Sequence, residues 1–390
     1  MADSEQVDRP IWEWPPEGNG DPTHTDALSE TLDIDVVVAG GGITGLTAAL
    51  LLASDKRRVA LLEARHLGAG TTGSTSAHVS AVPDDGYQAV LRTAGAEGGK
   101  EYVSRCAAAL EFMQHLVEAE HVDCEWARVP AYQFCERDDD LDFLRAEQEA
   151  AAQLGQMSQL VSDVPLPWHV AGALEFPQQA LFQPLAYLAG LKRIAVERGV
   201  AIHEHTPVLG WEETRGGVVV QTPHASARAA ALVLATHTPL GINPVQAELT
   251  PMQSYILAVS SSQPFPQALF WDLDDPYHYL RPVQFGGRSL VLVGGADQRP
   301  AGTFPTAMPI SSPMRTIASP DRPSSGGGRR NSSSRRTACR TSAEHRAPSA
   351  CTWPAVSRES VSCRARWRRW SSPRWCAARR ARTCRGARRA

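Results

Sequence analysis

The stretch that decides the fold is IDVVVAGGGITGLTAALLLASDKRRVALLE, which covers residues 34–63. It begins with a largely β-branched run at 34–39, which is typical of a buried parallel strand. A glycine-rich turn follows at 40–45, and the apolar residues 46–53 predict a helix. A second strand is then predicted, and it ends on Glu63. The order is therefore strand, glycine turn, helix, strand and acid.

The turn has the spacing G-x-G-x-x-G at Gly40, Gly42 and Gly45. Such glycines allow a tight turn and let a pyrophosphate approach the N-terminus of the helix. Glu63, 18 residues after Gly45, can accept the hydrogen bonds of an adenosine ribose. A turn that serves packing alone is the alternative. The flanking strands, helix and terminal acid favour a dinucleotide-binding α/β fold with a parallel sheet.

A loop of small and hydroxyl-bearing residues, GAGTTGSTSAH at 68–78, follows the acid. Its main-chain N–H groups and hydroxyls could reach a phosphate or a flat ring. An ordinary flexible loop is the alternative, and the position directly after the strand ending on Glu63 argues against it. Because simple NAD binding has no use for such a loop, the sequence predicts FAD as the ligand.

The rest of the body predicts further alternating elements. Helices are expected at 101–118, 139–154 and 181–198, the last beginning near Pro184, and strands at 208–211, 218–221, 230–235, 255–260 and 289–293.

Charge divides the chain into two unlike parts. Residues 1–299 carry 19 basic and 39 acidic residues, a net charge of −20, which disfavours binding to nucleic acid or to membrane phosphates. There is no apolar run of 18 residues, and residues 1–26 do not resemble a signal peptide, so a cytoplasmic protein is expected. The eight cysteines include no C-x-x-C pair and no Cys–His ligand spacing, so no metal site is predicted.

The segment 300–390 departs in composition from the body. It holds 20 arginines against three acidic residues, a net charge of +17, and the last leucine of the chain is Leu292. Such a segment cannot bury enough aliphatic surface to form a core, so we expect it to be disordered. It could be a basic arm that binds nucleic acid. Alternatively it is translated out of frame from a GC-rich gene, which is the interpretation we favour.

The combination of motifs resembles the D-amino-acid-oxidase-like FAD-dependent oxidoreductases, and more closely their bacterial members that often carry a Rieske iron–sulfur domain. The resemblance covers about residues 10–298. Its most specific parts are the phrase TTGSTSA at 71–77 and Cys124-Glu125-Trp126. It implies a Rossmann-like flavin domain interrupted by an antiparallel-sheet substrate domain.

The resemblance also implies roles for individual residues. The glycines of the turn and Glu63 would hold the ADP half of FAD, and the loop would approach its pyrophosphate and isoalloxazine. Val208 would contact the adenine side, and Arg281 and Tyr255 would contact the substrate, with Arg281 binding a carboxylate. The full cofactor set is Gly40, Gly42, Ile43, Thr44, Gly45, Glu63, Ala64, Thr71, Thr72, Gly73, Ser74, Thr75, Val208, Ala235, Thr236, Gly294 and Gly295.

These assignments predict a domain division and an activity. Residues 1–33 would be an N-terminal extension and 34–299 the oxidoreductase domain. Its flavin part would span about 34–82, 180–242 and 288–299, and its substrate part about 83–179 and 243–287. The expected reaction is oxidation of an amine or amino-acid C–N bond by hydride transfer to FAD, with oxygen or an unknown carrier as acceptor. The C-x-H and C-x-x-H pairs of a Rieske cluster are absent, and no catalytic residue stands out.

The out-of-frame interpretation rests on a family segment that is missing after Gln298. Relatives continue with a segment resembling DGLPYIGR and then a strand with a glycine-rich turn that caps the flavin. When residues 337–345 are back-translated with ordinary codons and shifted by two nucleotides, they permit GLPYIGRT. The hypothesis is a loss of frame between about Asp297 and Thr337, which would leave the chain as written a poor enzyme. A non-catalytic protein with a nucleic-acid-binding tail is the alternative.

Overall fold

The structure, a computed structural model, describes residue 12 and residues 25–238, 252–261, 264–285 and 287–298. One part of the fold is built on a parallel sheet with the strand order β12-β2-β3-β8. Its strands are β2 (Val36–Ala39), β3 (Val59–Leu62), β8 (Ala201–His203) and β12 (Ala231–Leu234). Every residue of β2 and β3 is buried, as their uninterrupted apolar runs predict.

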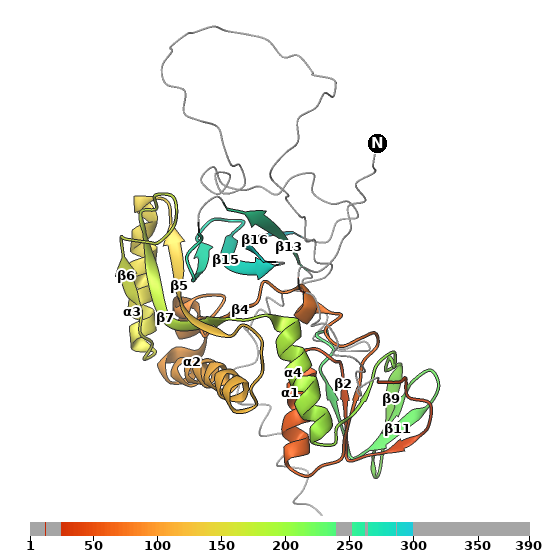
Figure 1. Cartoon of the computed structure of the whole chain (residues 1–390). Helices are drawn as coiled ribbons and strands as arrows, with labels where there is room; N and C mark the ends of the chain where they lie inside the picture. Colours follow the sequence, from red (N-terminus) through yellow and green to blue (C-terminus); the bar gives the residue numbers. More distant parts are fainter. Residues whose placement is uncertain (1–11, 13–24, 239–251, 262–263, 286, 299–390) are drawn as a thin grey trace, which may run out of the picture.

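Two helices cover one side of the parallel sheet. They are α1 (Ile43–Ser54) and α4 (Pro184–Glu197), and their buried residues form one apolar core with β2 and β3. The start of α4 is set locally, because Pro184 occupies the first turn and the Gln183 side chain accepts a hydrogen bond from the Ala186 N–H at 2.6 Å. Figure 1 shows α1 and α4 on one side of β2, with β9 and β11 on the other.

A second four-stranded sheet packs on the opposite side. Its order is β1-β11-β10-β9, from β1 (Leu32–Asp33), β9 (Gly210–Thr214), β10 (Gly217–Gln221) and β11 (Ser226–Ala229). Val218, Val220 and Ala227 pack against Val37 and Leu62 of the parallel sheet. The parallel sheet is therefore enclosed on both faces.

The remaining strands form an eight-stranded sheet that lies apart from the parallel one (Figure 1). Its order is β13-β16-β15-β14-β5-β7-β4, with β6 pairing β7. The strands are β4 (His78–Val79), β5 (Ala127–Cys135), β6 (Gln159–Val161), β7 (Gly172–Leu181), β13 (Gln253–Ser260), β14 (Leu269–Asp272), β15 (His278–Phe285) and β16 (Arg288–Gln298). Only β14 and β5 pair in parallel; the other ladders are antiparallel.

Two helices complete this part: α2 (Tyr87–Ala119) and α3 (Leu141–Gln153), with the short turn η2 (Asp138–Asp140) leading into α3. Non-helical backbone at Gly95, where φ is +68°, divides α2 into two straight pieces. The buried Glu147 of α3 accepts hydrogen bonds from the N–H groups of Tyr87 (2.6 Å) and Gln88 (3.2 Å). A carboxylate from one helix thus caps the N-terminus of the other.

The structure confirms the parallel sheet and the antiparallel insertion, and it corrects several boundaries. Helix α2 begins at Tyr87 rather than at residue 101, and the strand expected at 208–211 is β9, which begins at Gly210. Strand β16, placed in the flavin part by the expected boundaries, lies in the large sheet between β13 and β15. The predicted disorder of 300–390 concerns residues outside the described ranges. No helix among the described residues is long and apolar enough to cross a membrane.

Candidate functional site

The glycine turn closes tightly against the end of strand β12. Gly40 has a φ of +111°, which favours glycine, and a Cβ there would lie 2.4 Å from the Ala235 carbonyl oxygen. A Cβ on Gly45 would lie 1.9 Å from the Gly40 carbonyl oxygen. Ala235 itself continues the sheet, because its N–H donates to the Ala39 carbonyl at 2.8 Å. The sequence therefore needs glycine at 40 and 45 so that the turn can lead directly into α1.

The N-terminus of α1 faces the hydroxyl-rich loop. The Leu46 N–H donates to the Gly42 carbonyl at 3.0 Å, so the N–H groups of the preceding turn lie outside the helical ladder. The Ile43 N–H donates instead to the Thr72 hydroxyl at 3.1 Å. Thr72 belongs to the short helical turn η1 (Thr71–Ser74), which brings the predicted loop onto the positive end of the helix.

Glu63 stands at the carboxyl end of β3. Its carboxylate accepts hydrogen bonds from the N–H groups of Gly41 (2.6 Å) and Arg65 (2.9 Å). One oxygen is used by each donor, so each keeps capacity to accept from a hydroxyl. A carboxylate held beside a glycine turn in this way is suited to a ribose.

The other predicted cofactor residues surround this edge. Ala64 is exposed, Val208 is half-buried against the cluster that contains Val37 and Leu62, and Thr236 follows β12 with its hydroxyl donating to the Thr238 carbonyl at 2.8 Å. Gly73 allows close packing, because a Cβ would lie 2.4 Å from the Gly68 carbonyl oxygen.

Gly294 and Gly295 lie on β16, in the large sheet. A Cβ on Gly294 would meet the ring of Tyr279 at 2.1 Å, and Gly295 has a φ of +125° with a Cβ position 2.2 Å from the Tyr277 carbonyl oxygen. Both glycines pair with β13 on one side and with β15 on the other. Gly294 allows the Tyr279 ring to lie flat on the sheet.

The two predicted substrate residues lie on opposite faces of the large sheet. Arg281 pairs with Leu292 and Tyr279 with Gly294, so both side chains share the face that packs against the core of α1 and α4. Tyr255 pairs with Gly295 and therefore points to the other face. Tyr279, which the sequence analysis did not single out, is the tyrosine on the face of Arg281.

Arg281 is a buried cation held by main-chain oxygens. It is 1% exposed, and its Nη1 lies 2.7 Å from the carbonyl oxygen of Ala77, 3.2 Å from that of Phe182 and 3.4 Å from that of Ser76. Burial lowers the pKa of Arg281 to about 10, so the guanidinium stays charged at neutral pH. The indole of Trp12 covers it, with the ring centroid 5.4 Å from Cζ.

His78, the last residue of the loop, is packed and hydrogen-bonded. Its Nδ1 lies 3.0 Å from the Ser76 hydroxyl and its Nε2 3.2 Å from the Leu280 carbonyl oxygen. Burial, together with the charge of Arg281, lowers the pKa of His78 to about 3, so the ring is neutral at pH 7. The carbonyl partner makes Nε2–H a donor and leaves Nδ1 to accept from the hydroxyl. The ring of Tyr279 meets it edge-on at 5.4 Å.

Trp126 carries a buried polar atom with no partner. Its Nε1–H makes no hydrogen bond within the described part of the chain, and its ring packs edge-on against Phe182 at 6.2 Å. Phe182 is also the residue whose carbonyl binds Arg281. A buried donor without an acceptor costs about 1–3 kcal/mol, so an acceptor from outside the described residues would stabilise this position.

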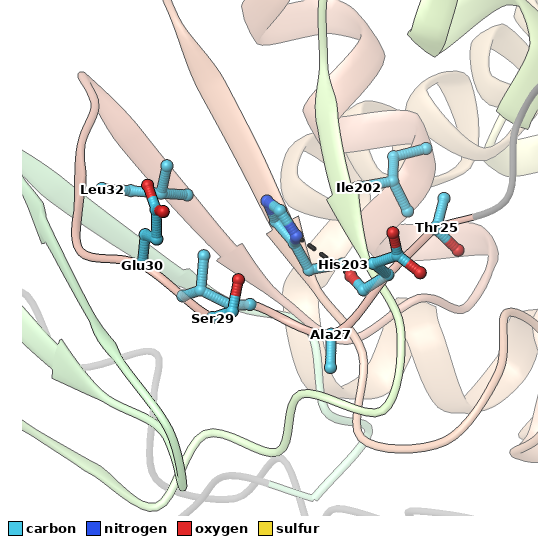
Figure 2. A pocket seen from close by; sticks show the side chains of 9 residues that line it. Thr25, Ala27, Ser29, Glu30, Leu32, Ile202 and His203 are labelled. Carbon is cyan, nitrogen blue, oxygen red and sulfur yellow. Dashed lines mark hydrogen bonds between the residues drawn. The ribbon is translucent and has the colours of Figure 1, made fainter.

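Two other features lie away from this arrangement. A hollow of about 390 Å³ is lined by residues 25–30, Leu32, Ile202 and His203. His203 Nδ1 lies 3.1 Å from the Asp26 carbonyl oxygen at this hollow (Figure 2). None of the predicted cofactor residues lines it. In the large sheet, Asp272, Asp274 and His278 offer grouped ligand atoms, but Asp272 is already bound by the N–H (2.7 Å) and Nδ1 (2.8 Å) of His278.

The residues present fit FAD. The turn has no room for a Cβ at Gly40 or Gly45, the N–H groups of the first turn of α1 face the loop, and Glu63 is fixed at the position of a ribose acceptor. A pyrophosphate at the helix N-terminus and a ribose at the acid are what this geometry accommodates.

Comparisons with known proteins agree with this geometry. The chain is 31% identical over 276 residues to the putative Rieske 2Fe-2S iron-sulfur protein YhfW of Bacillus subtilis, covering 70% of this chain and 54% of that protein. It is 26% identical to the probable oxidoreductase OrdL of Haemophilus influenzae, over 62% of this chain and 58% of that one. The chain thus spans little more than half the length of these relatives.

Among solved structures, glycine oxidase from Geobacillus kaustophilus has the same fold, with a TM-score of 0.56 at 19% identity over 73% of this chain and 76% of that one. The family of FAD-dependent oxidoreductases known as DAO matches residues 35–369. This range confirms the family resemblance and FAD as the cofactor. It also runs into the segment for which a lost frame was predicted, and that hypothesis stays a prediction. The chain belongs to the DAO family of FAD-dependent oxidoreductases.

Proposed function

We propose that this oxidoreductase removes a hydride equivalent from the carbon next to the nitrogen of a small amine or amino acid. When bound, FAD supplies the hydride acceptor, and the protein supplies binding, orientation and electrostatics. The observation that carries the proposal is the meeting of the cofactor loop with one face of the large sheet: Tyr279 and Arg281 lie on that face, against residues 76–78.

The chain's own residues suit an uncharged amine. His78 is neutral at pH 7, and burial raises the pKa of Tyr279, so its phenol is also neutral. Neither group would take a proton from an ammonium ion at neutral pH, so the amine is expected to bind in its neutral form. Buried aromatic rings on this face exclude water, which strengthens electrostatic contacts in the site.

Arg281 stays a proposed source of attraction for a substrate carboxylate, whereas Tyr255, the other residue predicted to contact the substrate, lies on the opposite face of the large sheet. The 1% exposure of Arg281 means that direct contact needs the Trp12 ring to move aside. Tyr279, on the same face as Arg281, is the better-placed phenol for such a substrate.

The division into a flavin part and a substrate part, and a cytoplasmic location, belong to the same proposal. So does the loss of the final flavin-contacting strand. In the described part of the chain, β12 is an edge strand and Leu234 at its end is 38% exposed. We expect weak FAD retention in the chain as written, and restored retention when the frame after about Asp297 is corrected.

One experiment tests the reaction directly. The FAD-loaded protein is mixed without oxygen with a panel of D- and L-amino acids, N-methylated amino acids and simple amines, and the bleaching of flavin absorbance is followed. Admission of oxygen with detection of hydrogen peroxide, or addition of an artificial acceptor, then separates an oxidase from a dehydrogenase. No bleaching by any amine in a frame-corrected, FAD-saturated protein contradicts the proposal. A salt-dependent shift of RNA mobility instead would support the nucleic-acid-binding alternative.

A further inference from the structure

The strongest feature outside the cofactor turn is the surroundings of Arg281. A buried guanidinium normally pairs with a carboxylate, because desolvating an uncompensated charge is costly. Here its acceptors are main-chain carbonyls: Nη1 reaches Ser76, Ala77 and Phe182, and Nε donates to Pro282 at 3.1 Å. The Arg281 guanidinium therefore holds the main chain at the end of the loop 68–78 in place.

Trp12 acts on the same main chain from the N-terminal side. It is 5% exposed, its Nε1–H donates to the Thr75 carbonyl at 2.7 Å, and its ring stacks over the Arg281 guanidinium. A cation over an indole face gains about 0.5–2 kcal/mol, with the larger values at desolvated sites. Two side chains that are 269 positions apart thus bind three consecutive carbonyls, at 75, 76 and 77.

The consequence for the loop is a fixed orientation of its peptide groups. In a planar trans peptide the N–H of the next residue points opposite to the carbonyl. The N–H groups of residues 76, 77 and 78 are therefore turned away from Trp12 and Arg281. Ala77 holds a left-handed φ of +59°, which an alanine adopts only when its surroundings impose it. The clamp supplies that constraint.

We propose that Trp12 and Arg281 form a clamp that positions the main chain of residues 75–78 against FAD. Trp12 is then a positioning residue of the redox site, contributed by a segment that precedes the flavin-binding strand β2. The proposal rests on the placement of FAD against the loop. A role for Arg281 in substrate anchoring alone makes a different prediction. Replacing Arg281 would then leave the loop unchanged in the protein without ligands.

The test compares backbone hydrogen exchange of the peptide covering 71–80 in the full chain without FAD. Trp12→Phe keeps an aromatic ring but loses the N–H donor, and Trp12→Leu loses both. Arg281→Lys keeps the positive charge but loses the several N–H donors of the guanidinium. Trp211→Leu on β9 and Arg228→Met on β11 are matched controls outside the clamp. Loss of one such buried hydrogen bond should speed exchange at 75–78 about tenfold.

A second readout reports on the cofactor. In the FAD-saturated chain, Trp12→Phe and Arg281→Lys should alter the visible circular dichroism of the flavin and lower FAD affinity, while the controls leave both unchanged. The double variant should be no worse than the worse single variant, because the two residues act as one unit.

Unchanged exchange at 75–78 in both Trp12→Leu and Arg281→Lys would overturn the clamp, as would strictly additive effects. Faster exchange at 75–78 with an unaltered circular dichroism of the flavin would show that Trp12 and Arg281 only stabilise the fold, and would overturn the positioning role. A rise in KM for carboxylate amines alone, with normal exchange, would return Arg281 to substrate anchoring. Failure of amine oxidation leaves the exchange result standing, so the two proposals fail separately.

Discussion

Replacing Gly45 by alanine should lower the affinity of the chain for FAD, whereas the same change at Gly216 should not. At Gly45 the new Cβ would lie 1.9 Å from the Gly40 carbonyl oxygen, and real Cβ atoms essentially never approach closer than 3.0 Å. The oxygen or the helix must therefore retreat by about 1.1 Å. Neither can rotate away, because both belong to the backbone of the turn and of α1.

The magnitude follows from the rigidity of the obstacle. Overpacking costs about 1–3 kcal/mol, and a main-chain clash belongs at the upper end. If about 3 kcal/mol falls on the cradle, FAD affinity drops by about two orders of magnitude. A Cβ on Gly216, in the exposed turn between β9 and β10, has nothing within 4 Å, and its φ lies outside the left-handed region, so Gly216→Ala is the matched control.

The assay is a titration of each purified variant with FAD, followed by quenching of flavin fluorescence. Urea unfolding without FAD, run in parallel, reports how much of the cost falls on the fold. Equal FAD affinities for Gly45→Ala and Gly216→Ala would refute the assignment of the turn at 40–45 as the pyrophosphate cradle.

Three further predictions follow from buried groups. The pKa of His78 is lowered to about 3 in the folded protein, against about 6.5 in the unfolded chain, so the unfolded chain binds a proton first as pH falls. The free energy of unfolding should therefore fall by about 1.4 kcal/mol per pH unit between pH 6.5 and 3. In urea titrations at several pH values, His78→Asn should abolish this slope. Trp126→Phe removes a buried N–H donor that has no acceptor within the described residues, so thermal unfolding without FAD should show equal or greater stability. Ligand binding should weaken by about 1–2 kcal/mol. Unaffected binding would show that the Trp126 N–H faces no ligand. Glu147→Ala should destabilise the chain by about 2 kcal/mol in urea unfolding, because two N–H groups of α2 lose their cap, whereas Glu149→Ala, at an exposed position, should change stability little.

Local sequence determined the nucleotide-binding half of the fold. The apolar runs of β2 and β3 are buried on both faces, and such strands read as continuous hydrophobic segments. The glycine spacing and Glu63 carry the rest of the signal, since all of these residues act within one strand–turn–helix–strand unit. Helix α4 was also predictable to within a few residues, because its capping Gln183 and Pro184 are adjacent in the chain.

Much of the large sheet was not predictable from the sequence. At some positions of β5, β7, β14 and β15 both faces of the strand are covered, and at other positions only one face is covered. The hydrophobic pattern of these strands is therefore neither continuous nor alternating. The sequence analysis missed the part of α2 that precedes residue 101, because Gly95, Gly98 and Gly99 weaken the helical pattern there. These elements are stabilised by pairing with distant segments rather than by their own periodicity.

The candidate site divides in the same way. The sequence by itself determined the ligand class, because the glycine turn, Glu63 and the hydroxyl-rich loop that indicate a dinucleotide all lie between residues 36 and 78. Only the tertiary structure decided what faces it: the register of β13, β15 and β16 puts Tyr279 and Arg281 on the inner face and Tyr255 on the outer one. It also brings Trp12 onto Arg281. The physical reason is that a strand's pairing register, and with it the face of each side chain, is set by hydrogen bonds to residues far away in the sequence.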